Sequence, residues 1–302
     1  MIRTLINGRE LKRDRPGKES HPMILPKTLR RDLALLALIP AIYLSACCGV
    51  HALDAGPSIA HTLDKHPAGP RLARELVEAE LINPTPLSDE LYIILLDACE
   101  ETPTVDAVNF PNEEAERAAM QHLIDRGCRN IAIIGHRFAP RADLAHAQNA
   151  FALRLRGACG ALSDAGLPYD ESTVFEAGDV ANGIIAGHAI AERILAARSG
   201  HGGTEFDGAC CANDFAAFGV IRGLADRGLR VPQDVKAIGF DGVTSGSYTT
   251  PALSTIQVDF TQLAKFSVDM LSERIDHGTD EALPPRRAII GYQLVDREST
   301  AV

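Results

Sequence analysis

The 302-residue sequence lacks the short motifs that mark many enzymes and metal sites. It contains no glycine-rich phosphate-binding loop, no His-Glu-x-x-His pair and no Gly-x-Ser-x-Gly turn. Its seven cysteines include no Cys-x-x-Cys pair, so they offer neither a regular metal-ligand set nor a disulfide framework. We therefore expect a protein that is not an enzyme and uses no metal or cofactor. Its cysteines are expected to be reduced, as small buried hydrophobes of a cytoplasmic protein.

Positive charge is scarce over most of the chain. The net charge of −10 at neutral pH excludes bulk electrostatic attraction of the whole chain to nucleic acid. The exception is residues 1–31, which hold nine Lys or Arg against three acidic residues. Such a basic segment is typical either of a nucleic-acid-binding arm or of a solvated tail, and the sequence leaves both open.

The most apolar segment is Leu33–Val50, which follows basic residues and leads through small residues to Cys47. This order resembles a bacterial lipoprotein export signal. However, Pro40 interrupts the run, and Met23 would have to be the true start of the protein. We therefore favour a buried helix or strand pair over a membrane anchor.

From Leu91 to the end, apolar runs of strand length alternate with amphipathic helices that end at glycine. The predicted strands are 91–96, 130–134, 172–176, 208–211 and 236–240, and the predicted helices are 113–126, 144–165, 183–197 and 215–227. This alternation predicts parallel sheets with right-handed crossovers and with helices on both faces.

Ligands of such sheets bind beyond the carboxyl ends of the strands. The rule directs attention to the residues that follow the predicted strands: Asp97, His136, the Gly178–Asp179 turn, Asn213 and Asp241. A carboxylate such as Asp241 can accept hydrogen bonds from ligand hydroxyls, and an amide such as Asn213 can both donate and accept. Asp214 is expected to cap the helix that begins at Phe215.

Three segments carry specific motifs. Val105–Gly135 contains His-Leu-Ile-x-x-Gly-x-Arg-x-Ile-Ala-x-Ile-Gly, and Ala212–Asp241 contains Asn-Asp-x-x-Ala-x-Gly, Gly-Leu-x-Val-Pro-x-Asp-Val and Gly-Phe-Asp. Tyr248–Gln257 contains Pro-x-Leu-Ser-Thr-Ile, and Leu294–Thr300 ends in Arg-x-Ser-Thr. Together these segments resemble the effector-binding domain of the lactose-repressor/galactose-repressor (LacI/GalR) family of transcription regulators.

The resemblance implies a two-lobed, periplasmic-binding-protein-like (type I) α/β fold with parallel sheets flanked by helices. We assign residues 91–302 to the effector-binding domain, with 91–110 and 253–280 in the N-terminal lobe and 112–250 mainly in the C-terminal lobe. Residues 1–90 contain nothing similar to the family's helix-turn-helix headpiece or to the first strand of its N-terminal lobe. That lobe is therefore expected to be incomplete, and a divergent, truncated or frame-shifted front remain open alternatives.

In this family the ligand lies between the lobes, where charged and amide side chains hold it. Arg154 matches the arginine of the family's Arg-x-x-Gly helix, and its planar guanidinium can grip two ligand oxygens. The resemblance assigns Asp97, Asn213 and Asp241 to the same ligand. Ala158 stands where the family usually has an aromatic residue, and Val180 stands where it often has an aromatic that stacks on the ligand. The loss of the stacking ring weakens the case for a sugar ligand.

The leading interpretation is a cytoplasmic, ligand-responsive transcription regulator whose sensor binds a small polar metabolite, a carbohydrate by analogy. Operator DNA as a partner, and a homodimer, follow from the resemblance alone. The alternative is an exported solute-binding lipoprotein of a sugar transporter, anchored at Cys47, and no membrane contact is expected otherwise.

Overall fold

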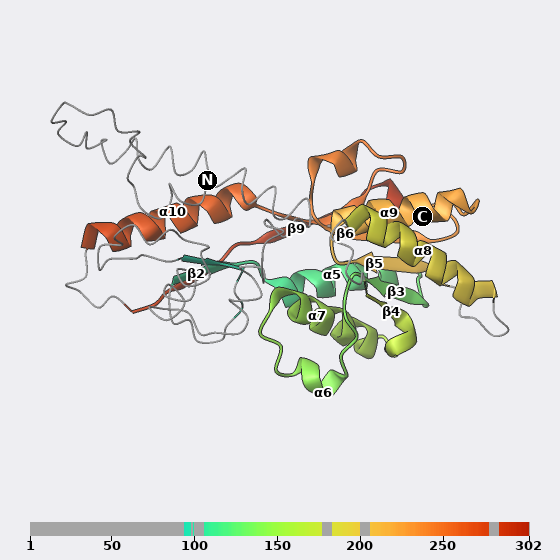
Figure 1. Cartoon of the computed structure of the whole chain (residues 1–302), viewed down its shortest axis with the longest axis horizontal. Coiled ribbons are helices and arrows are strands. Elements are labelled where there is room, and N and C mark those ends of the chain that lie inside the picture. The colour runs from blue at the N-terminus through green and yellow to red at the C-terminus, as the bar shows by residue number, and fades with distance from the viewer. Residues whose placement is uncertain are drawn as a thin grey trace, which may run out of the picture.

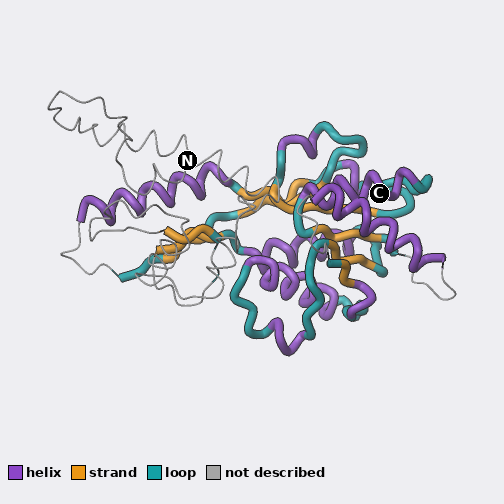
Figure 2. The backbone as a smooth tube through the Cα atoms, viewed as in Figure 1, coloured by secondary structure: helices purple, strands orange, loops and turns teal. Residues whose placement is uncertain are grey.

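The computed structural model describes residues 94–97, 99, 106–176, 183–199, 206–277 and 284–301. These residues form two lobes, one on a six-stranded sheet and the other on a three-stranded sheet (Figures 1 and 2). The predicted fold class, a two-lobed α/β structure with parallel sheets and flanking helices, is confirmed.

The larger lobe is built on the six-stranded sheet. Its strands, in spatial order, are β4 (Val174–Phe175), β3 (Ile131–Ile134), β5 (Gly208–Cys211), β6 (Lys236–Asp241), β7 (Ser254–Val258) and β9 (Tyr292–Val295). All neighbours pair in parallel except β7 and β9, which are antiparallel. The carboxyl ends of β3, β5 and β6 therefore lie along one edge of this sheet.

Helices cover both faces of this sheet. On one face α5 (Asn112–Asp125) packs against α7 (Ala150–Asp164), and on the other α8 (Gly183–Ser199) packs against α9 (Asp214–Asp226). Successive strand residues join opposite cores: Ile131 and Ile133 lie in the α5/α7 core, whereas Ala132 and Ile134 lie in the α8/α9 core. Burial on both faces explains why the strand is apolar throughout. The short helix α6 (Arg141–Leu144) precedes α7.

The smaller lobe contains β1 (Ile94–Leu96), β2 (Asp106–Asn109) and β8 (Arg287–Ile289), with α10 (Phe260–His277) packed against β1 and β2. The assignment of residues from 253 onward to this lobe is wrong for β7. That strand pairs with β6 of the large sheet, and the chain enters the small lobe only at α10. Strands of both sheets have similar apolar sequences, so the sequence alone does not say which sheet a strand joins. Only its hydrogen-bonded neighbour, here β6, decides this.

The Arg-x-Ser-Thr motif at the end of the chain ties the C-terminal segment to the large sheet. The Ser299 hydroxyl donates to the carbonyl of Ala237 and accepts from the amide of Ser254. Thr300 shares a hydroxyl contact of 2.6 Å with Ser254 and lies 2.9 Å from His122 Nε2. His122 therefore has a packing role between α5 and the end of the chain.

Five cysteines, at positions 99, 128, 159, 210 and 211, are buried and unpaired in the described part of the chain. Within the same ranges, none of the helices combines the length and hydrophobicity that crossing a membrane requires. The basic segment 1–31, the apolar run around Cys47 and the Gly178–Asp179 turn lie outside the described residues.

Candidate functional site

Close helix packing positions Arg154. At Gly157, three residues later on α7, an added Cβ would lie 2.1 Å from the carbonyl oxygen of Glu113. Only glycine allows α7 to approach the start of α5 this closely. The approach places Arg154 beside Asn112, the first residue of α5, which explains the spacing of the Arg-x-x-Gly motif in physical terms.

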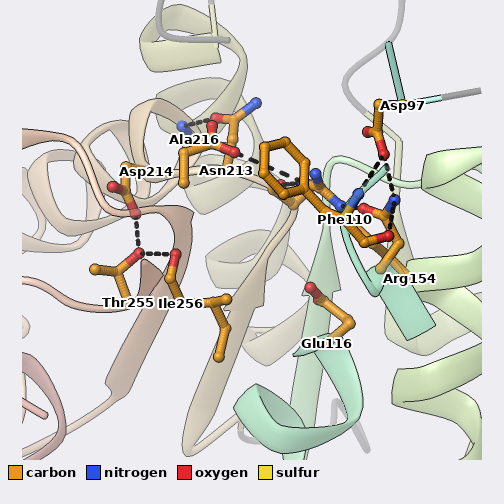
Figure 3. Close-up of polar contacts among 12 residues, drawn as sticks. Asp97, Phe110, Glu116, Arg154, Asn213, Asp214, Ala216, Thr255 and Ile256 are labelled. Atoms are coloured by element: carbon orange, nitrogen blue, oxygen red, sulfur yellow. Dashed lines mark hydrogen bonds and ion pairs between the residues drawn. The ribbon is translucent and has the colours of Figure 1, made fainter. Parts of the chain in front are cut away.

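Arg154 links several elements at the carboxyl edge of the large sheet, where it is 7% exposed. Its Nε donates to Asn112 Oδ1 at 2.8 Å, and its Nη1 donates to the carbonyl oxygen of Ala212 at 2.7 Å (Figure 3). The guanidinium carbon lies 3.6 Å from the centroid of the Phe240 ring, within cation–π distance. The arginine is thus held from three sides.

Asp97 contributes from the small lobe. It follows β1 in a left-handed backbone conformation, with φ of 55°, which few residues other than glycine adopt. Its Oδ1 accepts from Asn112 Nδ2 at 2.7 Å and from the amide of Phe110 at 3.4 Å (Figure 3). Asn112 therefore bridges Asp97 of one lobe and Arg154 of the other.

Asp241 is the last residue of β6 and lies beside the guanidinium. Its Oδ1 lies 4.0 Å from Arg154 Nη1, and its backbone φ of 108° is again positive. Burial raises the pKa of Asp241 well above its ordinary value, while Arg154 acts in the opposite direction. The sheet geometry thus brings together three predicted site residues, Asp97, Arg154 and Asp241.

Asn213, the fourth predicted site residue, lies at the same edge but has a structural bond. Its Oδ1 accepts from the amide of Ala216 at 2.8 Å, so it caps α9 (Figure 3). The prediction that Asp214 is the cap is therefore wrong, because the helix begins one residue earlier than expected. Asn213 Nδ2 carries two further N–H donors.

Asp214 instead ties the ends of β6 and β7 together. It accepts from the Thr255 hydroxyl at 2.6 Å and from the amide of Val243 at 2.7 Å. An added Cβ on Gly239 would lie 2.2 Å from its Oδ1, so the glycine of the Gly-Phe-Asp motif makes room for this carboxyl group. Burial raises the pKa of Asp214 to about 7, although its hydrogen bonds act in the opposite direction.

Two aromatic side chains at the site were not predicted. Phe240 lies beneath the guanidinium, and Phe151, at the start of α7, is 53% exposed with its ring centroid 5.7 Å from the guanidinium carbon. Phe151 also makes an edge contact with His136 at 5.9 Å. The half-exposed Phe151 ring beside the buried arginine offers an apolar face to a ligand. Position 158, where the family usually has an aromatic residue, is alanine here and offers no ring.

Glu116 and His136 lie deeper in the same cluster. Burial raises the pKa of Glu116 to about 7, although Arg154 acts in the opposite direction, and burial together with Arg154 lowers the pKa of His136 to about 3. Among the described residues, no group of three or more His, Cys, Asp or Glu side chains is arranged to hold a metal ion.

Three comparisons bear on this site. Residues 120–300 match the family model of the periplasmic binding protein-like domain. The HTH-type transcriptional repressor PurR of Aliivibrio fischeri (strain MJ11) is 30% identical over 186 residues, which cover 62% of this chain and 51% of the relative. The chain thus spans about half the length of the curated relatives it matches.

Solved structures agree. A putative LacI-family regulator from Sanguibacter keddieii superposes with a TM-score of 0.63 and 32% identity, covering 76% of this chain and 84% of that one. A LacI-family regulator from Enterococcus faecium with bound ribose shares the fold, with a TM-score of 0.59, 23% identity, and coverage of 77% and 76%. These matches favour a regulator over an exported lipoprotein. The chain belongs to the LacI/GalR family and contains its periplasmic-binding-protein-like domain.

Proposed function

We propose that this chain is the effector-sensing part of a transcription regulator, and that a small polar metabolite of the sugar class binds between its lobes. One observation carries the proposal: the bridge from Asp97 through Asn112 to Arg154, with Asp241 4.0 Å beyond. This bridge joins both lobes, and a ligand with hydroxyl groups can share or replace the hydrogen bonds that Asp97, Asn112 and Arg154 make. The Enterococcus faecium relative, solved with ribose, supports the ligand class.

The bridge also suggests how binding is coupled to regulation. Asp97 belongs to the small lobe, whereas Arg154 and Asp241 belong to the large one. A ligand that bonds to all three groups favours one relative position of the lobes over others, because a ligand shifts an equilibrium only by its differential affinity. In a homodimer, that shift would change operator DNA affinity. Operator DNA and a second copy of the chain are therefore the proposed partners.

A thermal-shift screen of the full chain tests this function, with D-ribose, D-glucose, D-glucosamine, adenosine and guanosine as probes. A compound that binds the folded state and not the unfolded chain raises the unfolding midpoint, and the rise grows with the logarithm of its concentration above Kd. We expect at least one to do so, and we expect Arg154→Ala and Asp241→Ala to abolish the shift. Arg154→Lys keeps the charge without the planar fork, and is expected to retain only part of the shift.

Arg156→Ala is the matched control. Arg156 lies two residues from Arg154 on α7, but it pairs with Glu113 outside the cleft. Two results would place the ligand elsewhere. One is that Arg156→Ala abolishes the rise of the unfolding midpoint as fully as Arg154→Ala does. The other is that the rise survives in both Arg154→Ala and Asp241→Ala.

A further inference from the structure

Glu116 and His136 form a buried polar pair beside Arg154. Glu116 lies on α5 four residues after Asn112, and therefore on the same helix face. His136 follows β3 at the carboxyl edge of the sheet. The two side chains are 0% and 1% exposed, and His136 Nε2 lies 3.9 Å from Glu116 Oε1, too far for a hydrogen bond.

The hydrogen-bonding capacity of this pair is largely unused. Among the described residues, neither ring nitrogen of His136 makes a hydrogen bond of normal geometry, although the backbone of Phe151 lies close enough to act on its pKa. Glu116 Oε2 also has no partner there, and Oε1 accepts only from the Cys210 thiol at 3.3 Å. A thiol is a weak donor.

Such an arrangement lowers the stability of the ligand-free protein. Buried polar groups are paired in nearly all native structures, and an unpaired group keeps its full desolvation cost. Asn112, one turn earlier on the same helix face, uses both its oxygen and its amide nitrogen. Asn112 is thus fully hydrogen-bonded, whereas Glu116 on the same helix face is not. This difference suggests that Glu116 meets a partner outside the protein chain.

The charge balance defines that partner. The positive charge of Arg154 lowers the pKa of Glu116, His136 and Asp241. The negative charges of Glu116 and Asp97 raise the pKa of Asp241. Two carboxyl groups, Glu116 and Asp241, thus share one guanidinium, and Asp97 adds a third carboxyl group that acts on Asp241. An anionic ligand group would add to the excess of acceptors, whereas a donor group would find acceptors that are unused.

We propose that Glu116 and His136 form a subsite of the effector cleft, and that this subsite binds a hydrogen-bond donor of the ligand, a hydroxyl or an amino group, and rejects phosphate and carboxylate. The half-exposed Phe151 ring contacts both His136 and Arg154, so the subsite lies next to a side chain that solvent reaches. The inference rests on the proposed function, since it concerns the ligand of the same cleft.

Paired measurements on the full chain test the subsite. In Glu116→Met, an apolar side chain of similar length replaces the carboxyl group, and Glu116→Gln keeps an acceptor oxygen. We expect Glu116→Met to leave the urea midpoint of the ligand-free protein unchanged or higher, and to weaken binding of the strongest compound of the five-compound panel about tenfold or more. Glu114→Met, on the exposed face of the same helix, is expected to bind as wild type does.

Ligand pairs distinguish the chemistry. If the donor is a hydroxyl, Glu116→Gln retains most of the affinity for the neutral sugars; if it is an amino group, D-glucosamine loses its affinity in Glu116→Gln as it does in Glu116→Met. In both cases D-ribose 5-phosphate is expected to bind wild type at least about tenfold more weakly than D-ribose.

The subsite is overturned if wild type binds D-ribose 5-phosphate as tightly as D-ribose. It is also overturned if Glu116→Met is less stable than wild type but keeps full affinity for the ligand. If wild type binds with Arg154 dependence but without Glu116 dependence, only the subsite is overturned. If wild type binds no panel member, the proposed ligand class is overturned together with it.

Discussion

Two regions of the molecule bury carboxyl groups in opposite ways. At the far end of the small lobe, Asp106 accepts from Arg274 Nε at 2.9 Å, from Arg274 Nη2 at 2.7 Å and from the amide of Arg286 at 2.8 Å. In the cleft, no described residue donates a hydrogen bond of normal length to the Asp241 side chain, and Glu116 has only a thiol donor. We expect the first region to stabilise the fold, and we propose that the second keeps unused hydrogen-bonding groups for a ligand.

The largest expected effect comes from breaking the paired region. Asp106→Ala leaves Arg274 and Arg286 without their shared carboxylate, and we expect the free energy of unfolding to fall by about 3 kcal/mol, near the low end for a broken buried pair because both arginines reach water. Urea denaturation measures this change. A loss below about 1 kcal/mol would mean that the cluster is no more than a surface ion pair.

Asp214 tests whether a well-paired carboxyl group at the cleft edge also stabilises the fold. Asp214→Ala leaves the Val243 amide unpaired in a buried position, and it leaves the Thr255 hydroxyl with only its longer bond to the carbonyl of Ile256 at 3.2 Å. We expect a loss of about 2 kcal/mol, the typical cost of orphaned buried groups. Asp170→Ala, in which an exposed carboxylate at the start of a short 3-10 helix is removed, provides the control. A cost for Asp214→Ala no greater than the control's would refute the role of these bonds.

The pH dependence of stability separates Glu116 from His136. The pKa of Glu116 is raised from 4.5 to about 7 in the folded state, so its contribution to stability falls as pH rises through that range. The pKa of His136 is lowered from 6.5 to about 3, so its contribution rises with pH between these values. In the wild type the two slopes oppose each other between about pH 4.5 and 6.5.

Single variants are therefore expected to diverge. Relative to wild type, Glu116→Gln should gain stability as pH rises over that window and His136→Gln should lose it, each by up to about 1.4 kcal/mol per pH unit. Urea unfolding at half-unit pH steps provides the curves. Parallel curves for wild type and both variants would contradict the burial of this pair.

Asp241→Asn is expected to have the smallest effect on stability. Because its carboxylate accepts no hydrogen bond of normal length from a described residue, we expect the free energy of unfolding to change by less than about 1 kcal/mol. The same variant should lose the ligand-induced shift of the unfolding midpoint. A substantial loss of stability in the absence of ligand would remove the distinction between the two regions.

The sequence predicted most helices and strands of the large lobe, and three of the proposed site residues were chosen by a rule about strand ends. Residues that follow neighbouring parallel strands lie at one edge of a sheet, so Asn213 and Asp241 were expected together. Asp97 was chosen by the same rule, but it follows a strand of the small sheet. Arg154 could not be placed in this way, because a helical arginine is usually exposed, and only the resemblance singled it out. Asp214 was misassigned because either residue of an Asn-Asp pair can cap a helix.

Glu116 shows what sequence patterns cannot resolve. It stands among Glu113, Glu114 and Arg117, a run that is typical of a solvated helix face. Its burial depends on α7 packing closely at Gly157 and on the position of Cys210, both set by tertiary contacts. His136 carried a positional signal, as a residue that follows β3, but its pairing with Glu116 depends on the same packing.

Hydrogen–deuterium exchange of the full chain, with and without the panel compound that raises the unfolding midpoint most, tests the central claim most directly. Amide protection reports local opening, and a bound ligand suppresses it where contacts form. We predict new protection around residues 150–154, 212–216 and 240–243, at the start of α7 and the ends of β5 and β6, with Arg154→Ala removing it. Protection confined to α10 and β8, or unchanged in Arg154→Ala, would contradict the assignment of this cleft as the ligand site.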